Sequence, residues 1–155
     1  MRRRSWRTHR WATSDQAAAS STPPDGIDGD INSMALLRGV TAVYQPAAEK
    51  GGLTFDLEIA GAAGGLYRGD SARVRRVLHC LCDNAVKFTP AGSVTLKVNL
   101  DGEQVVFRVS DTGIGIGESD LPHLFDGFFQ ADATFTRKYD GAGLGLAICR
   151  ELTHV

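Results

Sequence analysis

Two stretches of the chain carry apolar residues at three- and four-residue spacing, which predicts helices with one buried side. In the first stretch these residues are Leu36, Leu37, Val40, Val43, Tyr44 and Ala47. In the second they are Val74, Val77, Leu78, Leu81 and Ala85. The run Lys50-Gly51-Gly52 is expected to end the first helix. Asp70 or Ser71 can cap the start of the second, and Thr89-Pro90 ends it because proline cannot continue a helix.

A third helix is predicted near the end of the chain. It begins near Gly143-Leu144-Gly145 and carries Leu146, Ala147, Ile148 and Leu152.

Other segments alternate apolar and polar residues, which indicates strands with one buried face. In residues 53–59 the apolar positions are Leu53, Phe55, Leu57 and Ile59. Two later runs alternate in the same way, at Val94, Leu96, Val98 and Leu100 and then at Val105, Phe107 and Val109. Asp101-Gly102 between these runs favours a tight hairpin turn. Leu66-Tyr67-Arg68 is a candidate for a further short extended piece.

The order helix, strand, helix, hairpin, loop, helix predicts an α+β fold, a two-layer α/β sandwich with a mixed sheet and helices on one face. Residues 31–155 form this predicted domain. Residues 1–30 differ, because residues 11–30 are rich in Ala, Ser, Pro, Asp and Gly and lack periodicity. We interpret residues 1–30 as a basic, low-complexity tail or linker without stable structure.

Composition limits the classes of function. With 155 residues and 43% hydrophobic content, the chain can build the core of one domain. A net charge of -1 gives no reason to expect a nucleic acid or an acidic membrane as partner. Residues 1–10 are locally basic, and a solvated tail explains them as well as phosphate or lipid binding does.

Targeting and cysteine usage point to the cytoplasm. No apolar run approaches the roughly 18 residues of a membrane span, and no secretory signal follows the basic start. Three cysteines, Cys80, Cys82 and Cys149, suggest reduced thiols. Cys80 and Cys82 lie roughly 200° apart on a helix, so they are poorly placed to bind one metal ion.

The second predicted helix carries the first candidate for chemistry. Asn84 and Lys87 are three residues apart, on the side opposite the apolar stripe. An amide oxygen is a suitable ligand for Mg²⁺, and an ammonium group one turn away suits a phosphate. An ordinary solvated helix face is the alternative.

Two glycine-rich segments are the next candidates. Asp111-Thr112-Gly113-Ile114-Gly115-Ile116-Gly117 follows a strand directly, where a carboxylate can accept a hydrogen bond from an exocyclic amine such as that of adenine. Its glycines allow the backbone to approach a flat ring, although a tight turn is the alternative. Gly141-Ala142-Gly143-Leu144-Gly145-Leu146 opens a helix, whose free N–H groups can bind phosphate. An aromatic cluster at residues 124–129 lies between the two.

Better-known glycine motifs do not fit these segments. No Gly-Lys-Ser or Gly-Lys-Thr follows the glycines, which excludes a Walker A loop. The second segment does not follow a buried parallel strand, so a dinucleotide-binding fold fits badly. The motifs of the protein-kinase fold are also absent from the sequence.

Taken together and in this order, the segments resemble the N box, first glycine box, phenylalanine box and second glycine box of sensor histidine kinases. The resemblance covers residues 31–155 and includes Tyr67-Arg68-Gly69-Asp70 before the second helix. It implies the catalytic ATP-binding domain of such a kinase, within the wider group of gyrase, heat-shock, histidine-kinase and mismatch-repair ATPases. It also implies a cut-short C-terminal end.

The resemblance assigns roles to individual residues, with ATP and Mg²⁺ as cofactors. Asn84 would hold Mg²⁺, and Lys87 would contact phosphate oxygens. Asp111 would bind the adenine amine. The remaining assignments are Gly113, Ile114 and Gly115 for the base pocket, Phe88 beside the adenine, Arg137 or Lys138 in a lid for the γ-phosphate, and Gly141, Gly143, Leu144 and Gly145 for phosphate binding through backbone amides.

The implied reaction is transfer of the γ-phosphoryl group to a histidine of a partner dimerisation domain, with a response regulator receiver domain downstream. None of His9, His79, His123 and His154 has the sequence context of the family's acceptor histidine, so transfer is expected in trans. A serine kinase of the anti-sigma-factor type is an alternative, which the lid sequence Phe129-Gln130-Ala131-Asp132 disfavours.

Two departures from the family pattern favour a third reading, a weak or inactive module that only binds nucleotide or partners. Cys80 stands where the N box usually begins with another asparagine, and a thiol is a poor substitute for an amide. Family members also continue into further strands beyond the last helix, whereas this sequence stops at Val155. The pattern therefore predicts an unpaired sheet edge, marginal stability and weak nucleotide binding unless a partner covers that edge.

Overall fold

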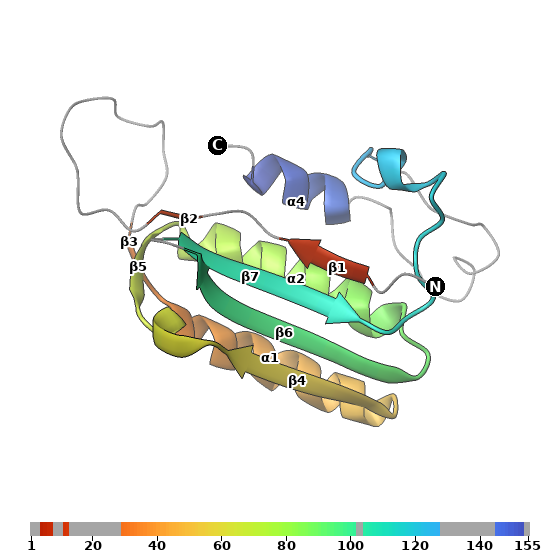
Figure 1. The fold of residues 1–155 in the computed structure, drawn as a ribbon, viewed down its shortest axis with the longest axis horizontal. Coiled ribbons are helices and arrows are strands. Elements are labelled where there is room, and N and C mark those ends of the chain that lie inside the picture. Colours follow the sequence, from red (N-terminus) through yellow and green to blue (C-terminus); the bar gives the residue numbers. More distant parts are fainter. Residues whose placement is uncertain (1–3, 8–10, 13–28, 102–103, 128–144, 154–155) are drawn as a thin grey trace.

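A mixed sheet with two long helices against one face forms the body of the protein (Figure 1). The computed structural model describes residues 4–7, 11–12, 29–101, 104–127 and 145–153. The sheet order is β1-β7-β6-β4, with β2 also paired to β7, and β3 and β5 form a separate two-stranded sheet. The predicted two-layer α/β sandwich is confirmed.

Helix α1 (Ser33–Lys50) begins at Asn32, whose side-chain oxygen accepts a hydrogen bond from the Ala35 N–H at 2.9 Å. Its buried side consists of Ser33, Leu36, Leu37, Val40, Tyr44 and Ala48. The prediction that Val43 and Ala47 are buried is wrong, since both are exposed and Val43 is 53% accessible. The stripe advances from Val40 in four-residue steps to Tyr44 and Ala48, and Val43 and Ala47 each lie about 100° around the helix from the one of these two that follows it.

Helix α2 (Ser71–Lys87) packs against α1, α4 and the strands β6 and β7. Asp70 caps it, accepting hydrogen bonds from the Ala72 and Arg73 N–H groups at 2.9 and 3.0 Å. The predicted apolar stripe is buried, and Cys82 is buried with it. Tyr44 of α1 donates a hydrogen bond to the His79 carbonyl at 2.8 Å, which fixes the two helices to each other. His79 thus has a structural contact.

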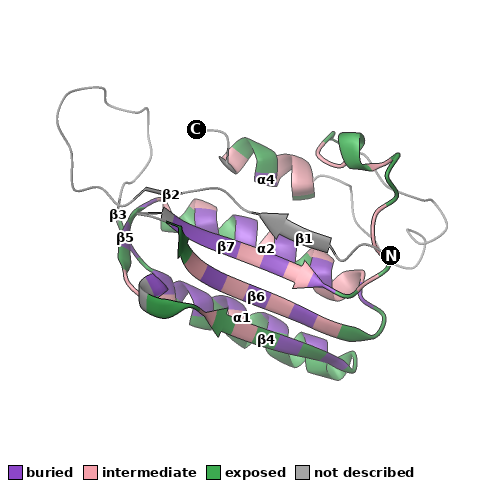
Figure 2. Cartoon of the chain, in the orientation of Figure 1, coloured by how far each residue is buried: buried purple, intermediate pink, exposed green. Residues whose placement is uncertain are grey.

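The central strands follow the predicted alternation at most positions, but Leu100 at the end of β6 is exposed and Val106 of β7 is buried together with Val105 and Phe107, which corrects the prediction there. β4 (Leu53–Ile59) pairs in parallel with β6 (Gly92–Asp101), and β6 pairs antiparallel with β7 (Gln104–Asp111). Asp101 pairs with Gln104 at the hairpin end, while Gly102 lies outside the described residues. Val94, Leu96 and Val98 of β6 belong to the same core as the stripes of α1 and α2, and Figure 2 shows buried residues on both helices and on β6 and β7.

The outer edge of β7 is paired, which corrects the expectation of an unpaired edge there. β1 (Arg4–Arg7) pairs antiparallel with residues 108–111, and β2 (Trp11–Ala12) pairs with Val105 and Gln104. Backbone N–H and C=O groups of β7 are therefore paired with strands of the same chain. Such pairing prevents the edge from pairing with another chain. The expected marginal stability stays a prediction.

The first 30 residues thus contain more structure than their composition predicts. Besides β1 and β2, β3 (Gly29–Asn32) pairs antiparallel with β5 (Leu66–Gly69), the short extended piece expected from the sequence. Pairing with distant residues stabilises these segments, and composition carries no information about it. Residues 1–3, 8–10 and 13–28 lie outside the described part.

Helix α4 (Gly145–Thr153) begins at the last glycine of the predicted start and packs on α2. Leu146 and Leu152 contact the core, and Cys149 belongs to it. Two 3₁₀ turns complete the described elements, η1 (Gly61–Ala63) and η2 (Leu121–His123). Within the described residues, no helix combines the length and apolar character of a membrane span.

Candidate functional site

The last turns of α2 carry the first two predicted site residues. Asn84 and Lys87 are both partly exposed and lie outside the set of residues that α2 buries. The Lys87 ammonium lies 5.3 Å from the centre of the Phe88 ring, a cation–π distance. A cation at this position also complements the negative end of the helix dipole. This end of α2 therefore presents an amide, an ammonium group and an aromatic ring together.

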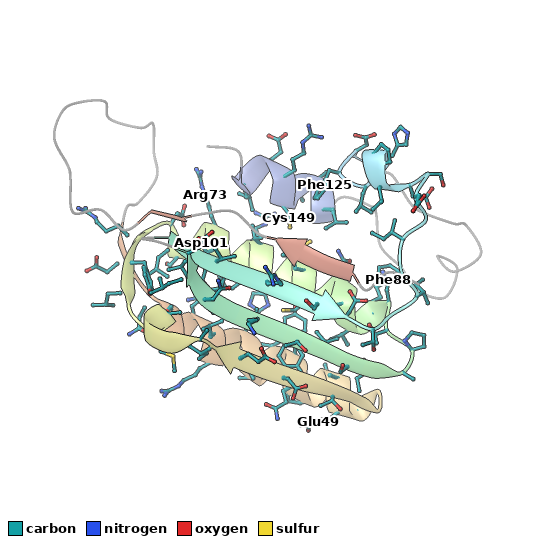
Figure 3. The ribbon with its side chains drawn as sticks, in the orientation of Figure 1. Glu49, Arg73, Phe88, Asp101, Phe125 and Cys149 are labelled. Atoms are coloured by element: carbon teal, nitrogen blue, oxygen red, sulfur yellow. The ribbon has the colours of Figure 1, made fainter. Side chains whose placement is uncertain are left out.

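The helix ends where the sequence predicts, through hydrogen bonds that use its last carbonyl groups. The Phe88 N–H donates to the Asn84 carbonyl at 3.0 Å, and Phe88 is the C-terminal cap. The buried Thr89 hydroxyl donates to the Ala85 carbonyl at 2.7 Å. These bonds satisfy groups that a helix end leaves without intrahelical partners. Figure 3 shows Phe88 at this end of α2, beside the end of β7.

The first glycine segment is fixed directly against Phe88. The Ile114 N–H donates to the Phe88 carbonyl at 3.1 Å. Asp111 is buried at the end of β7, and its Oδ1 atom accepts a hydrogen bond from the Gly113 N–H at 2.9 Å. Phe88 thus bonds to Asn84 through its N–H and to the glycine segment through its carbonyl. The structure brings Asp111, Gly113 and Ile114 to the helix end that carries Asn84 and Lys87.

Gly113 has a packing reason to be glycine. A Cβ atom there would overlap the Phe88 carbonyl oxygen and lie 2.9 Å from Asp111 Oδ1. Gly115 has a different reason, because its φ of +77° is a conformation that other residues adopt at a cost. Ile114 between them is 43% exposed, so an apolar side chain faces solvent beside the buried carboxylate.

A contact between β6 and β7 that the sequence did not predict holds this segment from the other side. The Ser93 N–H donates to Thr112 Oγ1 at 3.0 Å, and the Thr112 N–H donates to the Ser93 carbonyl at 3.1 Å. Gly92 has φ +119°, and a Cβ there would overlap Thr112 Oγ1. Glycine at the start of a strand is a sequence signal of close backbone approach, and Gly92 is the first residue of β6.

The start of α4 lies against α2 one turn before Asn84. A Cβ atom on Gly145 would be 3.0 Å from Cys80 Sγ. The Asn84 amide is within 3.9 Å of the same sulfur. Gly145, the last glycine of the second glycine segment, thus lies close to α2 one turn before Asn84.

Several predicted residues lie outside the described part of the chain, so the structure does not place them. They are Arg137, Lys138, Gly141, Gly143 and Leu144. Of the aromatic cluster, Leu124 and Phe125 are partly buried, and Phe128 and Phe129 are outside. His123 Nδ1 lies 3.0 Å from Asp126 Oδ2 on the surface.

Metal binding by side-chain clusters has no support in the described residues. They contain no group of three or more His, Cys, Asp or Glu side chains arranged to hold a metal ion. An ion at Asn84 would therefore need further oxygen ligands from a bound molecule or water, as Mg²⁺ bound with phosphates usually has.

Comparison with known proteins gives one family match. Residues 69–155 match the family described as histidine kinase-, DNA gyrase B-, and HSP90-like ATPase. The chain is 47% identical over 91 residues, 58% of its length, to the circadian input-output histidine kinase CikA of Synechococcus elongatus. It is 38% identical over 123 residues, 79% of its length, to the sensor histidine kinase RcsC of Escherichia coli. It spans 12% and 13% of these two relatives.

Solved structures give the same result for the fold. Full-length ShkA in complex with AMPPNP matches 83% of this chain with a TM-score of 0.69 and 34% sequence identity, over 26% of the ShkA chain. The nucleotide-free catalytic domain of the histidine kinase ThkA matches 81% with a TM-score of 0.67 and 25% identity, over 78% of that domain.

Proposed function

The chain belongs to the family of histidine kinase-, DNA gyrase B- and HSP90-like ATPases, and we propose that it is the ATP-binding catalytic module of a two-component sensor histidine kinase. In this proposal it transfers the γ-phosphoryl group of ATP to a histidine of a dimerisation domain that is not among these 155 residues. A receiver domain of a response regulator is the onward partner. The names of the relatives support the kinase class.

One observation carries the proposal. The segment that holds the buried Asp111 carboxylate is hydrogen-bonded to Phe88, the residue that ends the helix of Asn84 and Lys87. A carboxylate for a base, an amide for a cation and an ammonium group for phosphate therefore lie on segments that are hydrogen-bonded to each other at Phe88. The packing of α2 against β7 places these groups on neighbouring elements, and the bond between Ile114 and Phe88 fixes the glycine segment to the end of the helix.

The described residues fit an adenine nucleotide with Mg²⁺. Asp111 is a buried acceptor suited to the adenine amine, and Gly113, Ile114 and Gly115 form a backbone wall with one exposed apolar side chain. Phe88 offers a partly exposed ring for the base. Asn84 would contribute an oxygen to Mg²⁺, and Lys87 would contact phosphate oxygens.

Phosphoryl transfer depends mainly on positioning and charge neutralisation, which suits this set of groups. Bound Mg²⁺ would offset part of the phosphate charge. Lys87 would add a second positive charge, held in place by Phe88. Gly145, with Gly141, Gly143 and Leu144, would add backbone N–H groups, and Arg137 is proposed for the γ-phosphate.

Titration with a fluorescent ATP analogue, with Mg²⁺ and with a chelator, tests the Asn84 assignment. We expect Mg²⁺ to tighten binding to the parent chain. Asn84→Ala should lose about tenfold in affinity with Mg²⁺, roughly 1.4 kcal/mol, and little with the chelator. Asn99→Ala, near the opposite end of β6 from Ser93 and Val94, is the matched control and should bind as the parent does. Equal binding by Asn84→Ala and the parent under both conditions would remove Asn84 from the site.

A second candidate function is a module that binds nucleotide and partners without transferring phosphate. It is favoured by Cys80, which stands one turn before Asn84 in place of the family's usual asparagine. The Cys80 thiol lies next to the Cys149 thiol. Incubation with γ-labelled ATP and an isolated histidine acceptor domain distinguishes the two. Label on the acceptor that requires this chain supports the kinase, whereas nucleotide binding without label supports the second candidate.

A further inference from the structure

Two of the three cysteines meet between helices α2 and α4. Helix α4 packs on α2 so that Cys149 lies next to Cys80, although 68 residues separate them in the chain, and hydrogen bonding between the two thiols is the main influence on the pKa of each. Gly145, four residues before Cys149 on the same side of α4, also faces Cys80, since a Cβ there would be 3.0 Å from the sulfur. Figure 3 shows Cys149 on α4. The third cysteine, Cys82 on α2, is fully buried in the hydrophobic core between the helices and the sheet.

The two thiols of the pair have unequal surroundings. Donation of a hydrogen bond by Cys149 lowers the pKa of Cys80, against the opposing effects of burial and of Asp83. Donating that bond, together with burial, raises the pKa of Cys149, and the nearby Arg76 opposes this rise. Cys80 is also partly exposed, whereas Cys149 is buried. A thiolate therefore forms first on the cysteine that solvent reaches.

Cys82 provides an internal contrast. Burial is the main cause that raises its pKa to about 12. It also lies on the core side of the helix, away from Cys80. A buried thiol of this kind is inert toward oxidants, so the two cysteines of α2 should react differently.

We propose that Cys80 and Cys149 form a reversible disulfide when the protein meets a hydroperoxide, and that this bond locks α4 onto α2. The proposal does not depend on nucleotide binding. Cys80 lies one turn before Asn84, so the disulfide would form beside the candidate site. Neither Cys80 nor Cys149 is assigned to nucleotide binding.

The chemistry balances with hydrogen peroxide as oxidant. The Cys80 thiolate attacks one peroxide oxygen, the O–O bond breaks, and the hydroxide that leaves takes up a proton to become water. Cys80 is then a sulfenic acid. The Cys149 sulfur gives up its proton and attacks the Cys80 sulfur, and the S–O bond breaks to release the second water. Two thiols lose two electrons in total, and one peroxide is reduced to two waters.

The test uses the full chain and trypsin digestion without reductant. Cys80 and Cys82 fall in one tryptic peptide, residues 77–87, and Cys149 falls in residues 139–150. Cys82→Ala removes the ambiguity in the first peptide at little cost in volume. After limited hydrogen peroxide and alkylation of remaining thiols, mass spectrometry should find these two peptides joined, in the parent and in Cys82→Ala. Dithiothreitol should separate them.

Two further measurements follow the same samples. Free thiols should fall from three to one in the parent and from two to zero in Cys82→Ala. The midpoint of thermal unfolding should rise by about 10 °C on oxidation, because the bond closes a long loop of the unfolded chain. Cys149→Ala should show no rise. A dominant bond to Cys82, bonds between two chains, or three alkylatable cysteines after peroxide treatment would each overturn the proposal.

Discussion

Gly113→Ala is expected to destabilise the protein by about 3 kcal/mol, the upper part of the range for overpacked sites. The added Cβ would overlap the Phe88 carbonyl oxygen and approach Asp111 Oδ1 to 2.9 Å. Both neighbours are held by their own hydrogen bonds, to Ile114 and Gly113, so neither can move without breaking a contact. The midpoint of thermal unfolding, followed by far-ultraviolet circular dichroism, should fall by roughly 10 °C.

Two other glycines serve as controls with different expected results. Gly39 lies exposed in the middle of α1 with no atom within 4 Å of a Cβ position, so Gly39→Ala should stabilise by about 0.5–1 kcal/mol. Gly115 also has open space but a φ of +77°, so Gly115→Ala should cost about 1–2 kcal/mol through backbone strain alone. If Gly113→Ala unfolds at the parent's midpoint, the close contact with Phe88 does not exist in solution.

The parts of the fold that sequence reasoning predicts are those set by local patterns. The stripe of α2, its start at Asp70 and its end before Pro90 all follow from residues within one helix length. The alternation in β4 and β6 shows which face of each strand is buried. In these segments the buried side is fixed by helix or strand periodicity, which the sequence carries directly.

The parts that it does not predict depend on distant partners. β1 pairs with β7 over a separation of roughly a hundred residues, and its short run of arginine, serine and tryptophan has no strand periodicity to reveal this. The contact between Cys80 and Cys149 depends on how α4 docks on α2. The local sequence patterns of α2 and α4 do not show how these two helices pack. The candidate site is intermediate, because its motifs are local but their meeting at Phe88 is a tertiary contact.

Asp111→Asn should have the largest effect on nucleotide binding, a loss of about a hundredfold in affinity for ATP. Hydrogen bonds to a charged group contribute roughly 1.5–3 kcal/mol. The substitution keeps the shape of the side chain and an oxygen that can still accept from the Gly113 N–H, so the turn should remain folded. It replaces the other carboxylate oxygen with an amide N–H donor. That donor would face the adenine amine, itself a donor, and the two would repel.

Competition against a fluorescent ATP analogue by ATP and by inosine triphosphate measures this effect. Inosine carries a carbonyl oxygen where adenine carries the amine, so the parent chain should prefer ATP and Asp111→Asn should lose or reverse that preference. Asp56→Asn, an exposed position on β4, is the control and should keep both affinities. A loss of equal size for both nucleotides would mean that Asp111 supports the turn without reading the base. An unchanged ATP affinity would place the base elsewhere, because no contact with the amine would then pass through this carboxylate.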